Sequence, residues 1–251
     1  MKKYGGIRRL LHWLMALCKF WPQPAFISLP RYFRDWLHFV RMKGRAALSD
    51  SFPCLMDRTS TTAFDPHYFF QAAWLARKLA TARPERHVDI GSDIRILNVL
   101  SAFVPVDFLD YRPLKVNLQG LCCEADNLLG LSRADRTVGS LSCLHVIEHV
   151  GLGRYGDPID PDGTRKAAKE LNRVLAPSGR LYISLPVGRE RVCFNAHRVF
   201  DPDTVLGLFS GLQLDSFSFV DDAGEYHAVA NPQDAKGSEY ACGMYVFSRP
   251  S

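Results

Sequence analysis

The spacing of apolar residues changes near residue 64, where helical repeats in a basic segment give way to alternating helix and strand patterns. Short apolar runs that end at acidic or glycine residues are typical of buried strands. Strands are predicted at residues 87–91, 106–110, 118–123, 137–144, 180–185, 212–220 and 241–248, and helices at 65–83, 94–103, 164–175 and 202–209. This alternation predicts a Rossmann-like α/β domain with a mainly parallel, seven-stranded sheet covered by helices on both faces.

A basic extension, residues 1–62, precedes this domain, which we place at residues 63–251. Apolar residues recur at helical spacing within residues 7–21 and within 33–40, with basic residues between them. Prolines at both ends of residues 22–30 are expected to break the chain into two amphipathic helices. Neither run reaches the ~20 uncharged apolar residues that a membrane-spanning helix needs.

Positive charge is concentrated in this extension. Residues 1–45 carry ten lysine and arginine residues against one aspartate, whereas the whole chain has a formal net charge of +5. Basic amphipathic helices are typical of segments that lie on an anionic membrane surface. Packing against a partner subunit is the alternative, and nucleic acid is the least favoured partner.

Composition excludes several classes of protein. A hydrophobic fraction of 47% with 23% charged residues is ordinary for a chain with a packed core, and it excludes a disordered or fibrous protein. The seven cysteines include no C-x-x-C pair, so neither a disulfide framework nor a structural zinc site is expected. Reduced thiols indicate a cytoplasmic protein, which would lie at the inner face of the membrane if the extension binds lipid.

Acidic residues stand where three of the predicted strands end. Asp89 and Gly91 end the first strand, Asp110 ends the second, and Asp126 follows the third. Parallel sheets bind ligands at the carboxyl ends of their strands, and an acid after the second strand can accept both hydroxyls of a ribose. Each acid alone could instead cap a strand end. Their joint placement predicts a nucleoside-binding edge.

Candidate catalytic groups follow the fourth strand. His145, Glu148 and His149 lie just after it, and His197 lies in a later loop. A histidine of near-neutral pKa can take a proton from an attacking hydroxyl, although these side chains could also satisfy backbone groups. The His-x-x-Glu-His spacing matches an inverted zinc-protease motif, but that motif needs a helix, so no metal is expected here.

The loop after the fifth strand is rich in basic and polar residues. Arg189, Arg191, Asn195 and Arg198 would lie over the site if the sheet is parallel. Guanidinium groups suit a phosphate or carboxylate on an acceptor such as a sugar nucleotide or an acidic glycan. A solvated loop without a ligand is the alternative.

Residues from about 64 to 249 resemble the class I S-adenosylmethionine-dependent methyltransferases, most closely the group labelled type 11. The resemblance lies in a first motif at residues 88–91, an LEH-like segment at 145–150 and a helix–Pro–Gly–strand element at 170–181. It implies that S-adenosylmethionine is bound by Asp89, Gly91, Asp110 and Asp126. Residues 87–93 and 194–198 are also similar to a family of unknown function found among bacterial polysaccharide-synthesis proteins.

Two functions of different class are consistent with these residues. In the first, an enzyme transfers a methyl group to an oxygen or nitrogen of a small-molecule or glycan acceptor. In the second, a methyltransferase-like scaffold or nucleotide-binding protein has lost the cofactor. Asp93 and Arg95 stand where the family has the later glycines of Gly-x-Gly-x-Gly, which favours the second. The retained acids favour the first, and we expect the enzyme.

Overall fold

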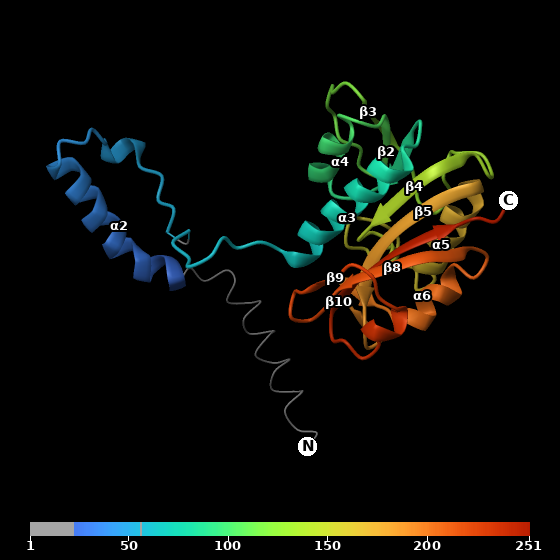
Figure 1. Ribbon diagram of the computed structural model, residues 1–251. Helices are drawn as coiled ribbons and strands as arrows, with labels where there is room; N and C mark the ends of the chain where they lie inside the picture. The colour runs from blue at the N-terminus through green and yellow to red at the C-terminus, as the bar shows by residue number, and fades with distance from the viewer. Residues whose placement is uncertain (1–22, 56) are drawn as a thin grey trace, which may run out of the picture. The chain divides into compact units, whose positions relative to one another are not determined.

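The computed structural model describes residues 23–55 and 57–251 (Figure 1). The chain divides into two compact units, residues 1–64 and 65–251. The helix expected within residues 7–21 lies outside the described residues. The first unit contains α2 (Gln23–Arg41) and a short 3-10 helix, η1 (Leu48–Asp50).

Helix α2 corrects the expected break at residues 22–30, because it begins at Gln23 and continues through Pro30. A proline inside a helix removes one backbone hydrogen bond, and the remaining bonds of this 19-residue helix are enough to carry it past that point. Phe33, Leu37 and Val40 follow one another at helical spacing and are exposed. Contact of residues 1–45 with an anionic membrane or a partner subunit stays a prediction. Among residues 23–55 and 57–251, no helix is long and apolar enough to cross a bilayer.

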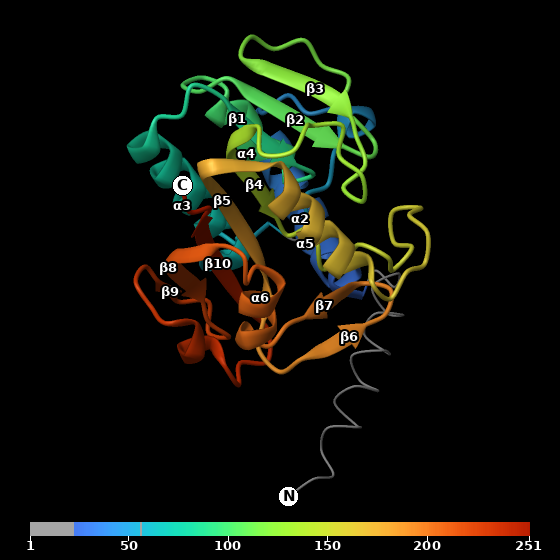
Figure 2. The same cartoon turned by 90° about the vertical axis from the view of Figure 1, so that its right-hand side faces the viewer.

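The second unit is built on one large sheet whose strand order is β3-β2-β1-β4-β5-β10-β8-β9 (Figure 2). Its strands are β1 (His87–Ile90), β2 (Val106–Asp110), β3 (Leu121–Ala125), β4 (Val138–Leu144), β5 (Leu175–Val187), β8 (Gln213–Val220), β9 (Tyr226–His227) and β10 (Ala241–Ser248). Strands β1 to β5 are parallel, and β10 runs antiparallel between β5 and β8. The expected α/β fold with a mainly parallel sheet is confirmed.

The sheet has eight strands, so the expected number of seven is wrong. The additional strand, β9, has two residues and pairs with the end of β8. A two-residue strand is too short to show an alternating pattern in the sequence. A separate hairpin of β6 (Arg191–Cys193) and β7 (His197–Val199) was missed for the same reason.

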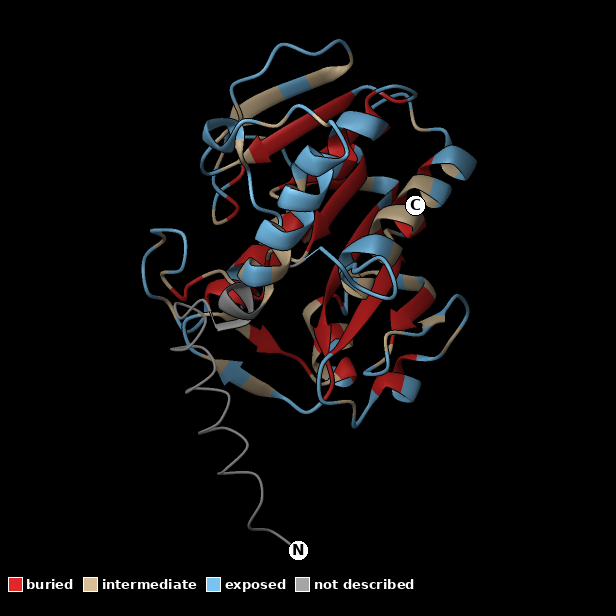
Figure 3. Ribbon diagram, turned by 90° about the vertical axis from the view of Figure 1, so that its left-hand side faces the viewer, coloured by how far each residue is buried: buried red, intermediate tan, exposed pale blue. Residues whose placement is uncertain are grey.

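Helices cover both faces of the sheet. They are α3 (Pro66–Ala82), α4 (Ile94–Leu100), α5 (Gly163–Val174) and α6 (Pro202–Leu208), with a 3-10 helix, η2 (Pro232–Ala235). Apolar residues of α3 and α4 pack in one core cluster and those of α5 and α6 in another. The central strands between them are buried, as Figure 3 shows. Burial on both faces explains why these strands read as continuous apolar runs.

A buried histidine lies inside β1. The His87 ring nitrogens Nδ1 and Nε2 each lie 2.8 Å from a serine hydroxyl, those of Ser140 and Ser142 on β4. Burial lowers the pKa of His87 to about 3, so the folded protein holds this ring neutral. The unfolded chain takes up a proton near pH 6.5. The stability that His87 contributes is therefore complete above pH 6.5 and is lost as the pH falls toward 3.

We expect the free energy of unfolding of the His87→Gln variant to depend less on pH, at acidic pH, than that of the wild type. Between pH 6 and 4, the free energy of unfolding of the wild type should fall by about 1.4 kcal/mol per pH unit relative to the variant. Urea unfolding at several pH values measures this difference. His227→Gln, at an exposed histidine, is the control. Parallel profiles for the wild type and His87→Gln would contradict the expectation.

Candidate active site

A pocket of about 310 Å³ lies at the carboxyl ends of β1, β2 and β4 and beside the loop after β3. This volume is at the lower end of the range for small-molecule sites. Gly91, Asp110 and Asp126 line the pocket together with His145 and His149. These five residues come from four separate segments of the sequence. Parallel register brings them together, since the corresponding strand ends meet at one edge of the sheet.

Asp110 is the last residue of β2 and lines the pocket. Its Oδ1 accepts a hydrogen bond of 2.6 Å from the backbone N–H of Arg112. Its Oδ2 lies 3.5 Å from the point where a β-carbon on Gly91 would stand. Gly91 has φ +65° there, and a side chain would also press on Val146 at 3.3 Å. Glycine at 91 thus keeps open the space beside the Asp110 carboxylate.

Asp126 lines the pocket and also holds its own loop. Its carboxylate accepts hydrogen bonds from the backbone N–H of Asn127 at 2.8 Å and of Ser132 at 3.1 Å, and from the Ser132 hydroxyl at 2.8 Å. These hydrogen bonds hold the loop after β3 together where it lines the pocket. The placement agrees with a position beside an adenine, which stays a prediction.

Asp89 occupies a different place from Asp110, because its side chain is buried beneath the pocket and does not line it. Its Oδ1 accepts from the Ser92 N–H at 3.0 Å and its Oδ2 from the Ser92 hydroxyl at 2.7 Å. The Ser142 hydroxyl donates to the same carboxylate. Burial raises the pKa of Asp89 to about 6, although the serine hydrogen bonds lower it. These hydrogen bonds tie Asp89 to the turn between β1 and α4, and its contact with a cofactor stays a prediction.

The two residues that replace family glycines lie outside the pocket lining. Asp93 is the N-cap of α4, and its Oδ1 accepts from the Arg95 backbone N–H at 2.9 Å. Arg95 also donates from Nε to Asp93 at 2.9 Å and forms an ion pair with it, while most of its side chain stays exposed. The hydrogen bonds from Arg95 lower the pKa of Asp93. Asp93 thus caps the N-terminus of α4, and the Arg95 side chain pairs with this cap.

His145 and Glu148 form a buried pair at the end of β4. The Nδ1 of His145 lies 2.8 Å from Oε1 of Glu148, and the two side chains are 6% and 1% exposed. On its other side, His145 Nε2 lies 3.4 Å from Sγ of Cys242. Burial favours the neutral ring, but Cys242 and the Glu148 carboxylate outweigh burial and raise the pKa of His145. His145 has φ +54°, a conformation that turns the chain sharply out of the strand.

His149 is oriented by a backbone carbonyl. Its Nδ1 lies 2.6 Å from the Ala196 oxygen, which can only accept a hydrogen bond, so Nδ1 carries the proton. The lone pair is then on Nε2, which lies 3.8 Å from the Glu148 carboxylate. Burial lowers the pKa of His149, so the ring is neutral near pH 7. His149 is thus a neutral imidazole beside a carboxylate at the pocket wall.

The residues of the predicted acceptor loop differ in their exposure to solvent. Arg198 is 8% exposed, and its Nη1 donates to the backbone oxygens of Val150 at 2.7 Å and Glu148 at 3.3 Å. This places Arg198 under the loop after β4, where it holds the loop and is not presented to an acceptor. Arg189 is exposed and pairs with Glu239 at 3.2 Å.

The remaining residues of this loop lie in or beside the β6–β7 hairpin. Arg191 donates to the backbone oxygen of Arg189 at 2.9 Å, and Asn195 is exposed at the turn. The His197 ring lies 4.9 Å from that of Tyr240, and burial lowers the pKa of His197. None of the loop residues from 189 to 198 lines the pocket described above.

Aromatic and cationic side chains also line the pocket, and the sequence analysis did not predict them. Tyr155 lines it, and the Arg112 guanidinium lies 4.6 Å from the centre of the Tyr155 ring. Tyr111, next to Asp110, also lines the pocket. The only available signal was their position directly after β2 or in the loop that follows β4. Which of these loop residues turn inward depends on the loop's conformation.

Comparisons with known proteins address the fold. A family model described as "Caenorhabditis protein of unknown function, DUF268" matches residues 134–235. No curated protein matches the chain. The solved structure of the N-methyltransferase NodS from Bradyrhizobium japonicum, in complex with S-adenosyl-L-homocysteine, is similar with a TM-score of 0.54 and 15% identity, covering 81% of this chain and 95% of that one.

A second similar structure is that of the YcgJ protein from Bacillus subtilis, with a TM-score of 0.52 and 13% identity over 73% of this chain and 99% of that one. The fold is that of the class I methyltransferases. Identities of this size establish the fold alone. The expected association with polysaccharide synthesis stays a prediction.

Proposed function

We propose that this protein transfers a methyl group from S-adenosylmethionine to an oxygen or nitrogen of a small-molecule or glycan acceptor. The observation that carries the proposal is the half-buried Asp110 carboxylate at the wall of a pocket that Gly91 keeps open. The methyltransferase fold places such a carboxylate where a ribose is bound. The similarity to NodS, whose structure holds S-adenosyl-L-homocysteine, supports the same cofactor class.

The residues at the pocket fit this cofactor. Asp110 would accept the ribose hydroxyls, Asp126 would lie on the adenine side, and Tyr155 offers an aromatic face. Asp93 and Arg95 do not line the pocket, so the bulk and charge that replaced two glycines do not fill it. The bound cofactor would supply an electrophilic methyl group on a sulfonium.

His149 is the best placed general base. With Nδ1 donating to Ala196, its Nε2 can take the proton that an acceptor hydroxyl or amine releases. The imidazolium formed in this way would be stabilised by the Glu148 carboxylate 3.8 Å away. Arg189, Arg191 and Asn195, which lie just before or within the β6–β7 hairpin, are proposed to bind anionic or polar groups of the acceptor.

Calorimetric titration of the full chain with S-adenosylhomocysteine tests the proposal. We expect one ligand per chain, with a dissociation constant between about 1 µM and 1 mM, the usual range for enzyme–substrate affinity. Circular dichroism of the same sample shows that the protein is folded. If folded protein releases no heat at millimolar ligand, the enzyme hypothesis is wrong, and a scaffold that has lost cofactor binding is favoured.

A further inference from the structure

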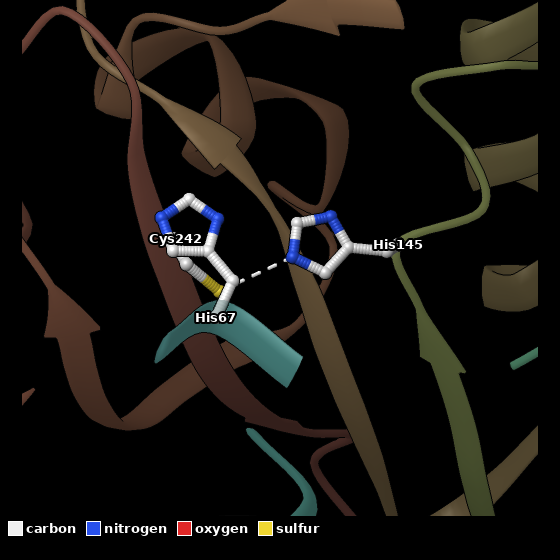
Figure 4. Close-up of side chains that lie close together, drawn as sticks. All are labelled: His67, His145 and Cys242. Carbon is white, nitrogen blue, oxygen red and sulfur yellow. Dashed lines mark hydrogen bonds between the residues drawn. The ribbon is translucent and has the colours of Figure 1, made fainter. Parts of the chain in front are cut away.

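Three potential metal ligands from distant parts of the sequence meet beside the pocket. His67 comes from the first turn of α3, His145 follows β4, and Cys242 lies at the start of β10 (Figure 4). One ligand atom from each of the three lies within 4.8 Å of the others. The imidazole and thiol groups face one another across a small space. Two nitrogens and one sulfur form a donor set that suits zinc rather than magnesium or calcium.

Distances within the cluster agree with a tetrahedral metal site. Nε2 of His145 and Sγ of Cys242 are 3.4 Å apart. Zn–N and Zn–S bonds at a tetrahedral angle place the two donor atoms about 3.5 Å apart. The third ligand atom, from His67, lies within 4.8 Å of the other two, and the His67 ring is half-buried and stacks on Tyr240 with the ring centres 5.2 Å apart.

Glu148 orients one of these ligands. Its Oε1 lies 2.8 Å from Nδ1 of His145, which leaves Nε2 of that ring directed at Cys242. A carboxylate behind the second nitrogen is the arrangement that usually supports a zinc-bound histidine. The other oxygen of Glu148, Oε2, is buried and has no hydrogen-bond partner. A polar oxygen that is buried without a hydrogen-bond partner is costly, and a nearby cation would offset this cost.

We propose that His67, His145 and Cys242 bind a zinc ion whose fourth coordination position is open. Three protein ligands and one exchangeable position are typical of catalytic rather than structural zinc. Tyr68 and Tyr240, whose rings stack on His145 and His67, are 38% and 39% exposed, so the cluster lies near the protein surface. His145 also lines the pocket described above, which places the ion at its wall.

Cobalt serves as a spectroscopic probe of the site in the full chain. After treatment with a chelator, the protein should bind one Co²⁺ per chain and show a thiolate charge-transfer band in the near ultraviolet with visible bands of tetrahedral cobalt. Added Zn²⁺ should displace the cobalt and abolish these bands. Zinc content of the purified protein, measured by mass spectrometry, should approach one per chain.

Substitution of single ligands tests which side chains bind the metal. Cys242→Ser should remove the charge-transfer band, and His67→Gln should weaken metal binding at least ten-fold. Cys193→Ser, at a half-buried cysteine outside the cluster, should leave both unchanged. If Cys242→Ser does not fold, His67→Gln decides the question, because His67 lies at a half-buried helix start. Absence of stoichiometric binding, or equal binding by His67→Gln and wild type, would overturn the proposal.

The metal site stands independently of methyl transfer. The cobalt spectrum reports the three ligands directly, whereas titration with S-adenosylhomocysteine reports the cofactor pocket. Either proposal can therefore be contradicted while the other still holds.

Discussion

Replacing Asp110 by alanine is expected to weaken the binding of S-adenosylhomocysteine by about 10- to 100-fold. The change removes the hydrogen bonds that the ribose hydroxyls would donate to the carboxylate, and a total loss of about 1.5–3 kcal/mol corresponds to this factor. The carboxylate stands at the end of β2 with Oδ1 held by the Arg112 N–H, so its orientation is set before a ligand arrives. Calorimetric titration of wild type and variant measures the ratio of dissociation constants.

Two further variants sharpen this test. Asp110→Asn keeps the shape of the side chain and should lose less affinity than alanine, because the amide oxygen still accepts one hydrogen bond. Asp215→Ala removes an aspartate that bonds Ser248 at the far side of the sheet, and it should bind as the wild type does. Equal affinity of Asp110→Ala and Asp215→Ala would show that Asp110 does not contact the ligand.

Arg198→Met should destabilise the second unit by about 1–3 kcal/mol. Methionine keeps much of the apolar stem but leaves the backbone oxygens of Val150 and Glu148 without their guanidinium donor. For a unit of this size, the loss corresponds to a fall in Tm of about 3–10 °C. Differential scanning calorimetry or thermal unfolding followed by circular dichroism measures it.

The matched control is Arg189→Met, because Arg189 is exposed and makes one surface ion pair with Glu239. Surface pairs contribute about 0–1 kcal/mol, so this variant should melt within about 3 °C of the wild type. An Arg198→Met variant with unchanged Tm would restore the hypothesis that Arg198 is presented to an acceptor.

Strands that are buried on both faces were predictable from their apolar runs. Val106–Asp110 and Ala241–Ser248 match their predicted ranges, and β4 begins one residue later than expected. The third strand starts at Leu121, three residues after the predicted start. Gly120 turns the chain there with φ +82°, and the Leu121 N–H bonds the Leu118 oxygen. Such a turn leaves no mark in the periodicity of apolar residues.

Residues at strand ends could be assigned to one edge without coordinates. Gly91, Asp110, Asp126, His145 and His149 do meet at the pocket, since parallel pairing aligns the carboxyl ends of neighbouring strands. The direction of a side chain at that edge depends on its neighbours. Asp89 turns inward to Ser92 and Ser142, and this is a matter of tertiary packing.

Local patterns in the amino-acid order therefore predict the longer strands and helices, and which acidic residues and histidines stand at the carboxyl ends of the parallel strands. Packing alone decides which charges are withdrawn from solvent, as with Arg198 under the β4 loop. Packing also brings His67, His145 and Cys242 within reach of one ion from three separate segments. The physical reason is that hydrophobic periodicity describes how a segment faces the core, whereas contacts between segments depend on the register and crossing of all of them.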